Sequence, residues 1–298
     1  MYAEFKHTLR RLRGQVIGWS IGLTLYSVLM VSMYSSIQGI EGLAEMLASY
    51  PPELLAFFGD LTAITTAQGY MDVYYFSYMT VIIGIFVVSA GASLIVGDEE
   101  KGTLDLIMSQ PVSRTQLFLG RCLGFVAATV LVLLIGWLTW VLPPPSEEMG
   151  LTWIEFLRPF LPLAAELLLF GTLALLLSLV MPASRAAGMT AGGLLVANYL
   201  LTGLANINQD LQNAVEFTPL HYYQGGSAIE GLNWSWLAGL LAASVVLVVL
   251  AWWRFQRRDI RVGGERSWRL PALSNLLQRK GRRNRKPETK GPEETKPW

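Results

Sequence analysis

Six long apolar stretches, nearly free of charged side chains, constrain this chain more than any other feature. A helix needs about 20 apolar residues to cross the ~30 Å hydrocarbon core of a bilayer, and backbone in contact with lipid must satisfy its own hydrogen bonds. We therefore expect an all-α integral membrane protein. Its six transmembrane helices are predicted at about 15–38, 73–97, 117–142, 162–181, 186–205 and 232–254, within a domain of residues 15–261.

The composition excludes several other classes of protein. Of the 298 residues, 52% are hydrophobic and 15% are charged, whereas soluble domains have about 25% charged residues. Cys122 is the single cysteine, so no intrachain disulfide forms. With two histidines in addition, the chain lacks the usual ligands of a zinc site, and no metal site is expected.

The formal net charge of +1 hides a strong separation of charge along the chain. Every lysine and arginine except Arg158 falls before, between or after the predicted spans on the same side of the membrane. Because positive residues remain on the cytoplasmic side, this distribution predicts that both termini are cytoplasmic. The loops on the other side are acidic.

Two segments flank the predicted spans. Residues 1–14 are predicted to form an amphipathic interfacial helix, with Phe5, Leu9 and Leu12 on one face and cations on the other; the alternative is a set of positive flanking residues without a helix. Residues 262–298 form a basic, mostly disordered cytoplasmic tail that is attracted to anionic lipid. Little else supports nucleic-acid binding by this tail, and we expect none.

The loop between the second and third spans is longer than a simple connection requires. Gly102 and Thr103 can begin a short helix that ends near Ser109, before Pro111. An acidic cluster at 98–100 precedes this helix, and its apolar face is predicted to consist of Leu104, Ile107 and Met108. The loop therefore suggests a docking surface for another protein. The alternative is an interfacial helix that touches only lipid headgroups, but the acidic cluster would be repelled by an anionic leaflet.

The sequence contains no motif for ATP hydrolysis. Residues 97–103 partly match a phosphate-binding loop, but the lysine after the second glycine is absent and the segment follows a membrane helix. We therefore expect that this chain is not an enzyme. Glu166 is the carboxylate nearest a span interior, where charged groups are often functional; a structural role and a role in a substrate path or in proton linkage both remain open.

The stretch 98–121, with its acidic start, Gly-Thr-Leu and Pro-Val-Ser-Arg, resembles the signature of permease subunits of type-2 ATP-binding cassette (ABC) exporters. Residues 217–223 and 254–260 resemble two further stretches of that family. The resemblance covers about residues 1–261. It implies a cell-membrane protein, in the cytoplasmic (inner) membrane of a prokaryote.

The resemblance also implies partners and sites. Two permease chains, identical or related, would pair in the bilayer, each with a separate ABC ATPase that carries the ATP and Mg²⁺, while this chain holds no cofactor. Coupling through residues 98–116 would use a coupling helix, and the second and fifth spans would line the substrate path. The coupling residues would be Asp98, Glu99, Glu100, Lys101, Gly102, Thr103, Leu104, Asp105, Ile107 and Met108. The path residues would be Met79, Phe86, Asn198 and Tyr199, with Glu166 as a further candidate.

Two other functions remain open from the sequence. An ion-coupled secondary transporter should have internal repeats and charges near the membrane midplane, and the chain has no clear repeat between its halves. A membrane-anchored scaffold or sensor would not itself need the elaborated loop, although a partner of such a protein might. The charge-free first span fits an apolar or amphiphilic cargo, but it does not identify one.

Overall fold

The structure is a computed structural model that describes residues 1–50, 63–109 and 112–258. These residues form helices and no strands, and six of the helices are long and apolar enough to cross a membrane. The predicted all-α class with six candidate spans is therefore confirmed. The spans are α1 (Tyr2–Gln38), the continuous α4–η2–α5 unit (Ala67–Ser93), α8 (Arg114–Val141), α9 with α10 (Trp153–Val180), α11 (Ser184–Ala205) and α13 (Trp234–Arg257).

The first helix differs from its prediction. Residues 1–14 were expected to form a separate interfacial helix, but they are the beginning of α1, which continues without a break from Tyr2 to Gln38. No proline interrupts this stretch, and a lone glycine such as Gly14 costs a helix only about 1 kcal/mol. Thr8 and Leu12 are buried on the face that packs against α8. Tertiary packing therefore extends the helix through the predicted boundary.

The second span begins earlier than predicted and is not uniform. It consists of α4 (Ala67–Met71), a π-helical turn η2 (Asp72–Phe76) and α5 (Ser77–Ser93). The side chain of Thr66 accepts a hydrogen bond from the backbone N–H of Gly69 and caps α4. A π-helical turn inside a longer helix is rare and often occurs near functional sites.

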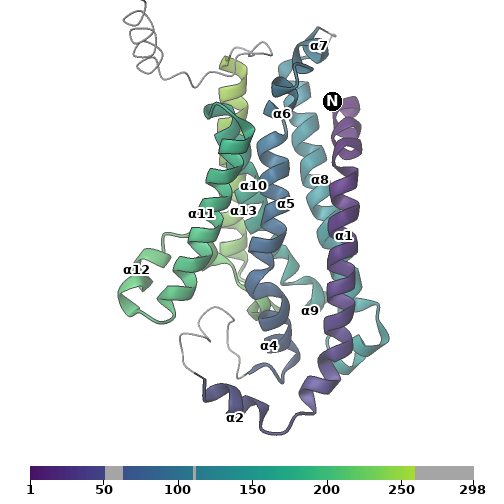
Figure 1. The fold of residues 1–298 in the computed structure, drawn as a ribbon, viewed down its shortest axis with the longest axis vertical. Helices are drawn as coiled ribbons and strands as arrows, with labels where there is room; N and C mark the ends of the chain where they lie inside the picture. The colour runs from purple at the N-terminus through teal and green to yellow at the C-terminus, as the bar shows by residue number, and fades with distance from the viewer. Residues whose placement is uncertain (51–62, 110–111, 259–298) are drawn as a thin grey trace, which may run out of the picture. The chain divides into compact units, whose positions relative to one another are not determined.

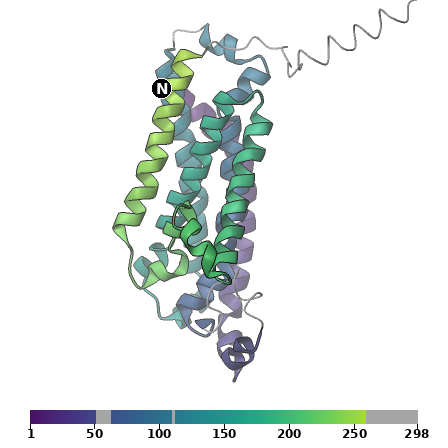
Figure 2. The ribbon, with the colours of Figure 1, turned by 90° about the vertical axis from the view of Figure 1, so that its left-hand side faces the viewer.

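Helix α10 (Phe160–Val180) lies at the centre of the bundle. It packs extensively on α5 and α13 and also contacts α11, while α1 packs mainly on α8 (Figures 1 and 2). In the fourth span 67% of the most apolar window is buried, compared with 22% in α1 and 22% in α13. The outer helices therefore present most of their apolar surface to their surroundings, as helices in a bilayer do.

Helices α5 and α10 approach closely through two glycines. A Cβ atom at Gly91 would overlap the backbone carbonyl oxygen of Gly171, and a Cβ at Gly171 would overlap the ring of Phe125. Small residues permit such close backbone contact between membrane helices. The small residues near Gly91 therefore serve packing within one chain.

Replacement of Gly91 by alanine is expected to destabilise the protein. The added methyl group must displace backbone rather than a flexible side chain, at a cost of about 1–3 kcal/mol or more. Thermal unfolding of the detergent-solubilised protein measures the effect. Gly239→Ala in α13 is the matched control, because a Cβ there meets nothing within 4 Å. Equal melting temperatures for the two variants would contradict the close packing.

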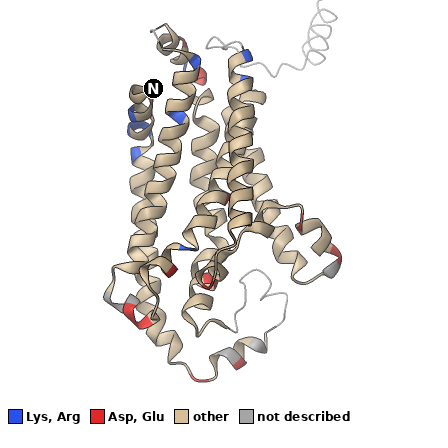
Figure 3. Ribbon diagram, turned by 180° about the vertical axis from the view of Figure 1, so that it is seen from behind, with Lys and Arg blue, Asp and Glu red and all other residues tan. Residues whose placement is uncertain are grey.

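The two ends of the bundle differ in charge. Most lysines and arginines of the described residues lie at the end that contains the N-terminus, and most acidic residues lie at the opposite end (Figure 3). We call these the basic end and the acidic end. The basic end carries α6 (Val96–Glu100) and α7 (Leu104–Met108). The acidic end carries α2 (Leu43–Ala48), η3 (Pro144–Met149), α9 (Trp153–Leu157), η4 (Gln209–Leu211), α12 (Gln212–Val215), η5 (Pro219–Tyr222) and η6 (Gly225–Ile229). The predicted basic tail at 262–298 lies outside the described residues.

Candidate functional site

The predicted docking loop forms two short helices, α6 and α7, at the basic end (Figure 1). Gly102 joins them with a φ of +69°, a left-handed conformation that glycine adopts without strain. The backbone N–H and the hydroxyl of Thr103 both donate to the backbone carbonyl of Asp98, at 2.9 and 3.1 Å. These bonds fix the direction in which α7 leaves α6.

Asp98 lies in a buried cluster of ion pairs. Its Oδ2 is 2.7 Å from Nη1 of Arg121 and 3.2 Å from Nη1 of Arg11. Arg121 also pairs with Glu4 through Nε, at 3.3 Å, and donates through Nη1 to the carbonyl of Leu94, at 3.0 Å. The cluster therefore joins α1, α6 and α8 at the point where the second span ends.

The next two acidic residues attach α6 to two further helices. Glu99 pairs with Arg258, which directly follows α13, with 3.1 Å between Oε2 and Nη2. The carboxylate of Glu100 accepts hydrogen bonds from the backbone N–H and the hydroxyl of Ser184, both at 2.7 Å. Ser184 is the first residue of α11, where unpaired backbone N–H groups favour a negative charge. Helix α6 is thus bonded to α11 and to the end of α13.

These contacts change the interpretation of the acidic cluster. The sequence suggested that Asp98, Glu99 and Glu100 form part of a surface for a partner. In the structure Asp98 and Glu99 are only 5% and 6% exposed, and all three carboxylates bond to groups of the same chain. Buried charges need such partners. The predicted coupling residues that remain exposed are Glu100, Lys101, Thr103 and Asp105.

The apolar residues of α7 are also arranged differently from the expectation. Leu104 is 1% exposed, and Ile107 and Met108 are half-buried against the core of the same chain. The exposed apolar residue of α7 is Leu106, at 69%, which lies outside the predicted apolar face. In the sequence, Leu106 is a single leucine on the polar face of the predicted helix, and this feature could have indicated an exposed contact residue.

The residues predicted to line the substrate path do not come together at one described cavity. Met79 lines a groove between α1 and α5, and the ring of Phe86 lies 6.4 Å from that of Trp19 in α1. Asn198 of α11 is 7% exposed, and its side-chain amide has no hydrogen-bond partner among the described residues. Tyr199 is half-buried on the same helix. These residues were predicted because they lie on the second and fifth spans. Of the four, only Met79 lines the groove.

Glu166 is buried within α10. It is 1% exposed, and neither carboxyl oxygen has a hydrogen-bond partner in the part of the chain that the structure describes. Nearby, Asp72 accepts a hydrogen bond of 2.6 Å from the backbone N–H of Gly226. Burial, together with the carboxyls of Asp72 and Glu166, raises the pKa of Tyr223 well above its ordinary value, so its hydroxyl remains a donor to the carbonyl of Phe76. Among the described residues, no group of His, Cys, Asp and Glu is arranged to hold a metal ion.

Substitution of Glu166 by methionine is expected to stabilise the protein. A buried polar group without a hydrogen bond costs about 1–3 kcal/mol, and methionine fills similar space without that cost. Thermal unfolding should therefore show a higher melting temperature for Glu166→Met. The control is Glu148→Met, an exposed position at the acidic end where little change is expected. A lower melting temperature for Glu166→Met alone would mean that the carboxyl is bonded in the folded protein.

Comparison with known proteins agrees with this architecture. A family described as ABC-2 family transporter protein matches residues 4–260, which is nearly the whole described bundle. No match is found among curated proteins. Six membrane-spanning helices fit a multi-pass permease rather than a soluble ATPase. The chain therefore belongs to the ABC-2 transporter family, as a membrane permease of an ABC transporter.

Proposed function

We propose that this chain is the permease subunit of an ATP-driven exporter and that α7 transmits the work of a separate ABC ATPase. The observation that carries this proposal is the structure of the basic end. Leu106 is exposed on α7, and the adjoining α6 is bonded to α1, α8, α11 and the end of α13. The ATPase would hold the ATP and Mg²⁺. Residues 98–116 of this chain would provide the contact and its support.

The distribution of charge supports an orientation with the basic end in the cytoplasm. Lysines and arginines concentrate on the cytoplasmic side of membrane proteins, and they gather at the end that contains the N-terminus and the end of α13 (Figure 3). Arg158, the arginine at the acidic end, donates to the carbonyl of Ile229 at 2.8 Å. The guanidinium of Arg158 thus bonds to a backbone carbonyl of the same chain. With this orientation both termini and α7 face the cytoplasm of a prokaryotic cell, where an ATPase operates.

The contacts of α6 support transmission of force. A force on Leu106 reaches α6 through Gly102 and the two bonds of Thr103 to Asp98. The ion pairs of α6 then pass it to α1, α8 and the end of α13, and Glu100 passes it to the first residue of α11. Since these bonds join α6 to each of these helices, the basic ends of the helices are expected to move as a unit.

A second permease chain would complete the transporter. Helices α1, α11 and α13 expose many large apolar side chains, which either lipid or a second copy can cover. The substrate would then pass between the two chains. Whether the second chain is identical or related is decided by the subunit composition of the purified complex.

The proposal is tested by co-expression of this chain with an ABC ATPase from the same genomic neighbourhood. We expect a detergent-stable complex that contains both subunits and hydrolyses ATP, whereas the permease alone does not. Affinity purification through a tag on the permease, followed by mass spectrometry, identifies the partner. Failure of every neighbouring ATPase to co-purify would contradict the proposal.

One observation favours an ion-coupled secondary transporter: the buried carboxyl of Glu166 has no hydrogen-bond partner within residues 1–50, 63–109 and 112–258. Membership in the ABC-2 family weighs against that function. Transport into vesicles without ATP but with an imposed proton gradient would distinguish the two. We expect no transport under that condition.

A further inference from the structure

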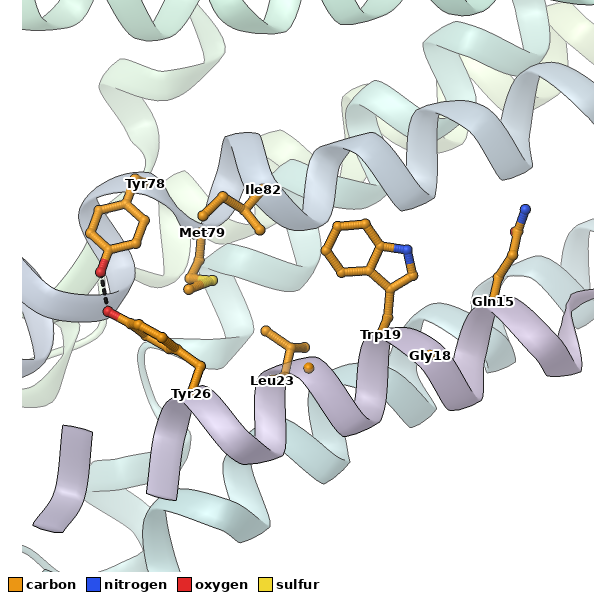
Figure 4. Close-up of a pocket in the computed structure, with 9 residues that line it drawn as sticks. Gln15, Gly18, Trp19, Leu23, Tyr26, Tyr78, Met79 and Ile82 are labelled. Atoms are coloured by element: carbon orange, nitrogen blue, oxygen red, sulfur yellow. Dashed lines mark hydrogen bonds between the residues drawn. The ribbon is translucent and has the colours of Figure 1, made fainter. Parts of the chain in front are cut away.

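A groove lies between the middle of α1 and the first turns of α5, in the half of α5 that is farther from the basic end. Its volume is about 520 Å³, within the range of about 300–1,000 Å³ that is typical of small-molecule sites. Figure 4 shows the side chains of the two helices facing each other across it. The lining consists of Gln15, Gly18, Trp19, Gly22, Leu23 and Tyr26 of α1 and Tyr78, Met79 and Ile82 of α5.

The sequence of α1 creates this groove. Gly18 and Gly22 lie one helical turn apart, and a Cβ at either position would meet no atom within 4 Å. The space is therefore not needed for contact between the two helices. At one end the hydroxyls of Tyr26 and Tyr78 hydrogen-bond to each other and close the groove (Figure 4). At the other end Gln15 is exposed and its side-chain amide has room for a partner.

The dimensions and polarity of the groove fit one apolar chain. The rise along α1 from Gln15 to Tyr26 is about 16 Å, roughly half of the ~30 Å hydrocarbon core and so close to the depth of one leaflet. Among the described residues none that lines the groove is charged, and the middle of the groove is formed by Trp19, Leu23, Met79 and Ile82. The tyrosine hydroxyls already bond to one another and to the carbonyl of Tyr74. The polar groups that a ligand meets are therefore the Gln15 amide and the indole N–H of Trp19.

We propose that the groove binds a single-chain amphiphile as the transported substrate, with its apolar chain between α1 and α5 and its polar head at Gln15. This inference rests on the proposed function, because it assigns a substrate class to the permease. Gln15, Gly18 and Gly22 are exposed, so the groove opens sideways and a molecule can enter from the surrounding lipid.

The test uses the full-length chain in nanodiscs of two-chain phospholipid, without an ATPase. The probe is a single-chain fatty alcohol with a photoreactive diazirine and an alkyne tag. We expect mass spectrometry to locate the label on peptides that contain Trp19, Met79 or Ile82. We also expect an excess of unlabelled fatty alcohol to reduce the labelling at least tenfold.

Variants connect the labelling to the groove. The double variant Gly18→Leu, Gly22→Leu should fill the space and reduce the labelling at least tenfold, while Gly239→Leu in α13, where a Cβ also meets nothing, should not. Gln15→Leu is the milder variant, and it should weaken competition by the fatty alcohol several-fold without filling the groove. Size-exclusion profiles identify any variant that fails to fold.

Two results would overturn the proposal. Labelling that the fatty alcohol does not compete for, or that is unchanged in the filled variant, would mean that the groove contacts only bulk lipid. A disulfide-linked dimer formed through Gly18→Cys at the expense of labelling would mean that a second copy covers it. Because no ATPase is present, failure of the substrate assignment and failure of ATPase coupling appear in separate experiments.

Discussion

Replacement of Arg121 by methionine is expected to lower the free energy of unfolding by about 3–5 kcal/mol. Arg121 is fully buried, at 0% exposed, and its guanidinium pairs with Asp98 and Glu4 and donates to the carbonyl of Leu94. Its loss leaves carboxylates at the basic end with fewer partners in a site that water does not reach. Thermal or denaturant unfolding of the purified protein should show a large decrease in stability.

The matched control for this variant is Arg185→Met. Arg185 lies near the same end of the bundle but is exposed, so its removal should change the free energy of unfolding by less than about 0.5 kcal/mol. Addition of Asp98→Leu to the Arg121 variant should recover part of the loss, because a buried charge is then removed as well. Equal stabilities of the two arginine variants would show that the ion-pair cluster does not hold α6.

Introduction of aspartate at Leu106 is expected to abolish the association with the ATPase. An unpaired carboxylate that is buried in an interface weakens the binding free energy by several kcal/mol. Each 1.4 kcal/mol is a tenfold change in affinity. The amount of co-purified ATPase should therefore fall by at least about tenfold. Since Leu106 is 69% exposed in this chain, the Leu106→Asp variant should still insert and keep its melting temperature.

Phe217→Asp is the control for that experiment. Phe217 is 90% exposed and lies at the acidic end, so the same chemical change there should leave ATPase binding intact. Leu104→Asp is a poor substitute for the Leu106 variant, because Leu104 is 1% exposed and a charge there would disrupt the chain itself. Undiminished co-purification with Leu106→Asp would exclude α7 as the coupling surface.

The six spans could be predicted from the sequence because lipid requires a long stretch of apolar residues. A stretch of about 20 apolar residues has few alternatives to a membrane helix, and all six candidates are present among the described helices. The boundaries were less accurate. The start of α1 is held by packing of Thr8 and Leu12 against α8, and contacts between distant residues are not visible in local hydropathy.

The sequence indicated residues 98–108 as the candidate coupling segment, but it did not indicate the contacts that these residues make. The acidic residues 98–100 were interpreted as a solvent-facing surface because charges are usually exposed. The partners of Asp98 and Glu99 are Arg11, Arg121 and Arg258, which come from three distant parts of the sequence, and the partner of Glu100 is Ser184. The groove between α1 and α5 could not be predicted from the sequence either, because the sequence does not show that Gly18 and Gly22 face open space. These features follow from tertiary packing and require the fold.

The central claim is that α7 is the contact site of an ABC ATPase, and photo-crosslinking tests it most directly. A photo-crosslinking amino acid is placed at position 106 or at position 217 of the full chain, co-expressed with the neighbouring ATPase and irradiated in membranes. We predict a covalent adduct with the ATPase from position 106 and none from position 217. An ATPase that co-purifies with the chain but cross-links from neither position, or from position 217, would contradict the claim.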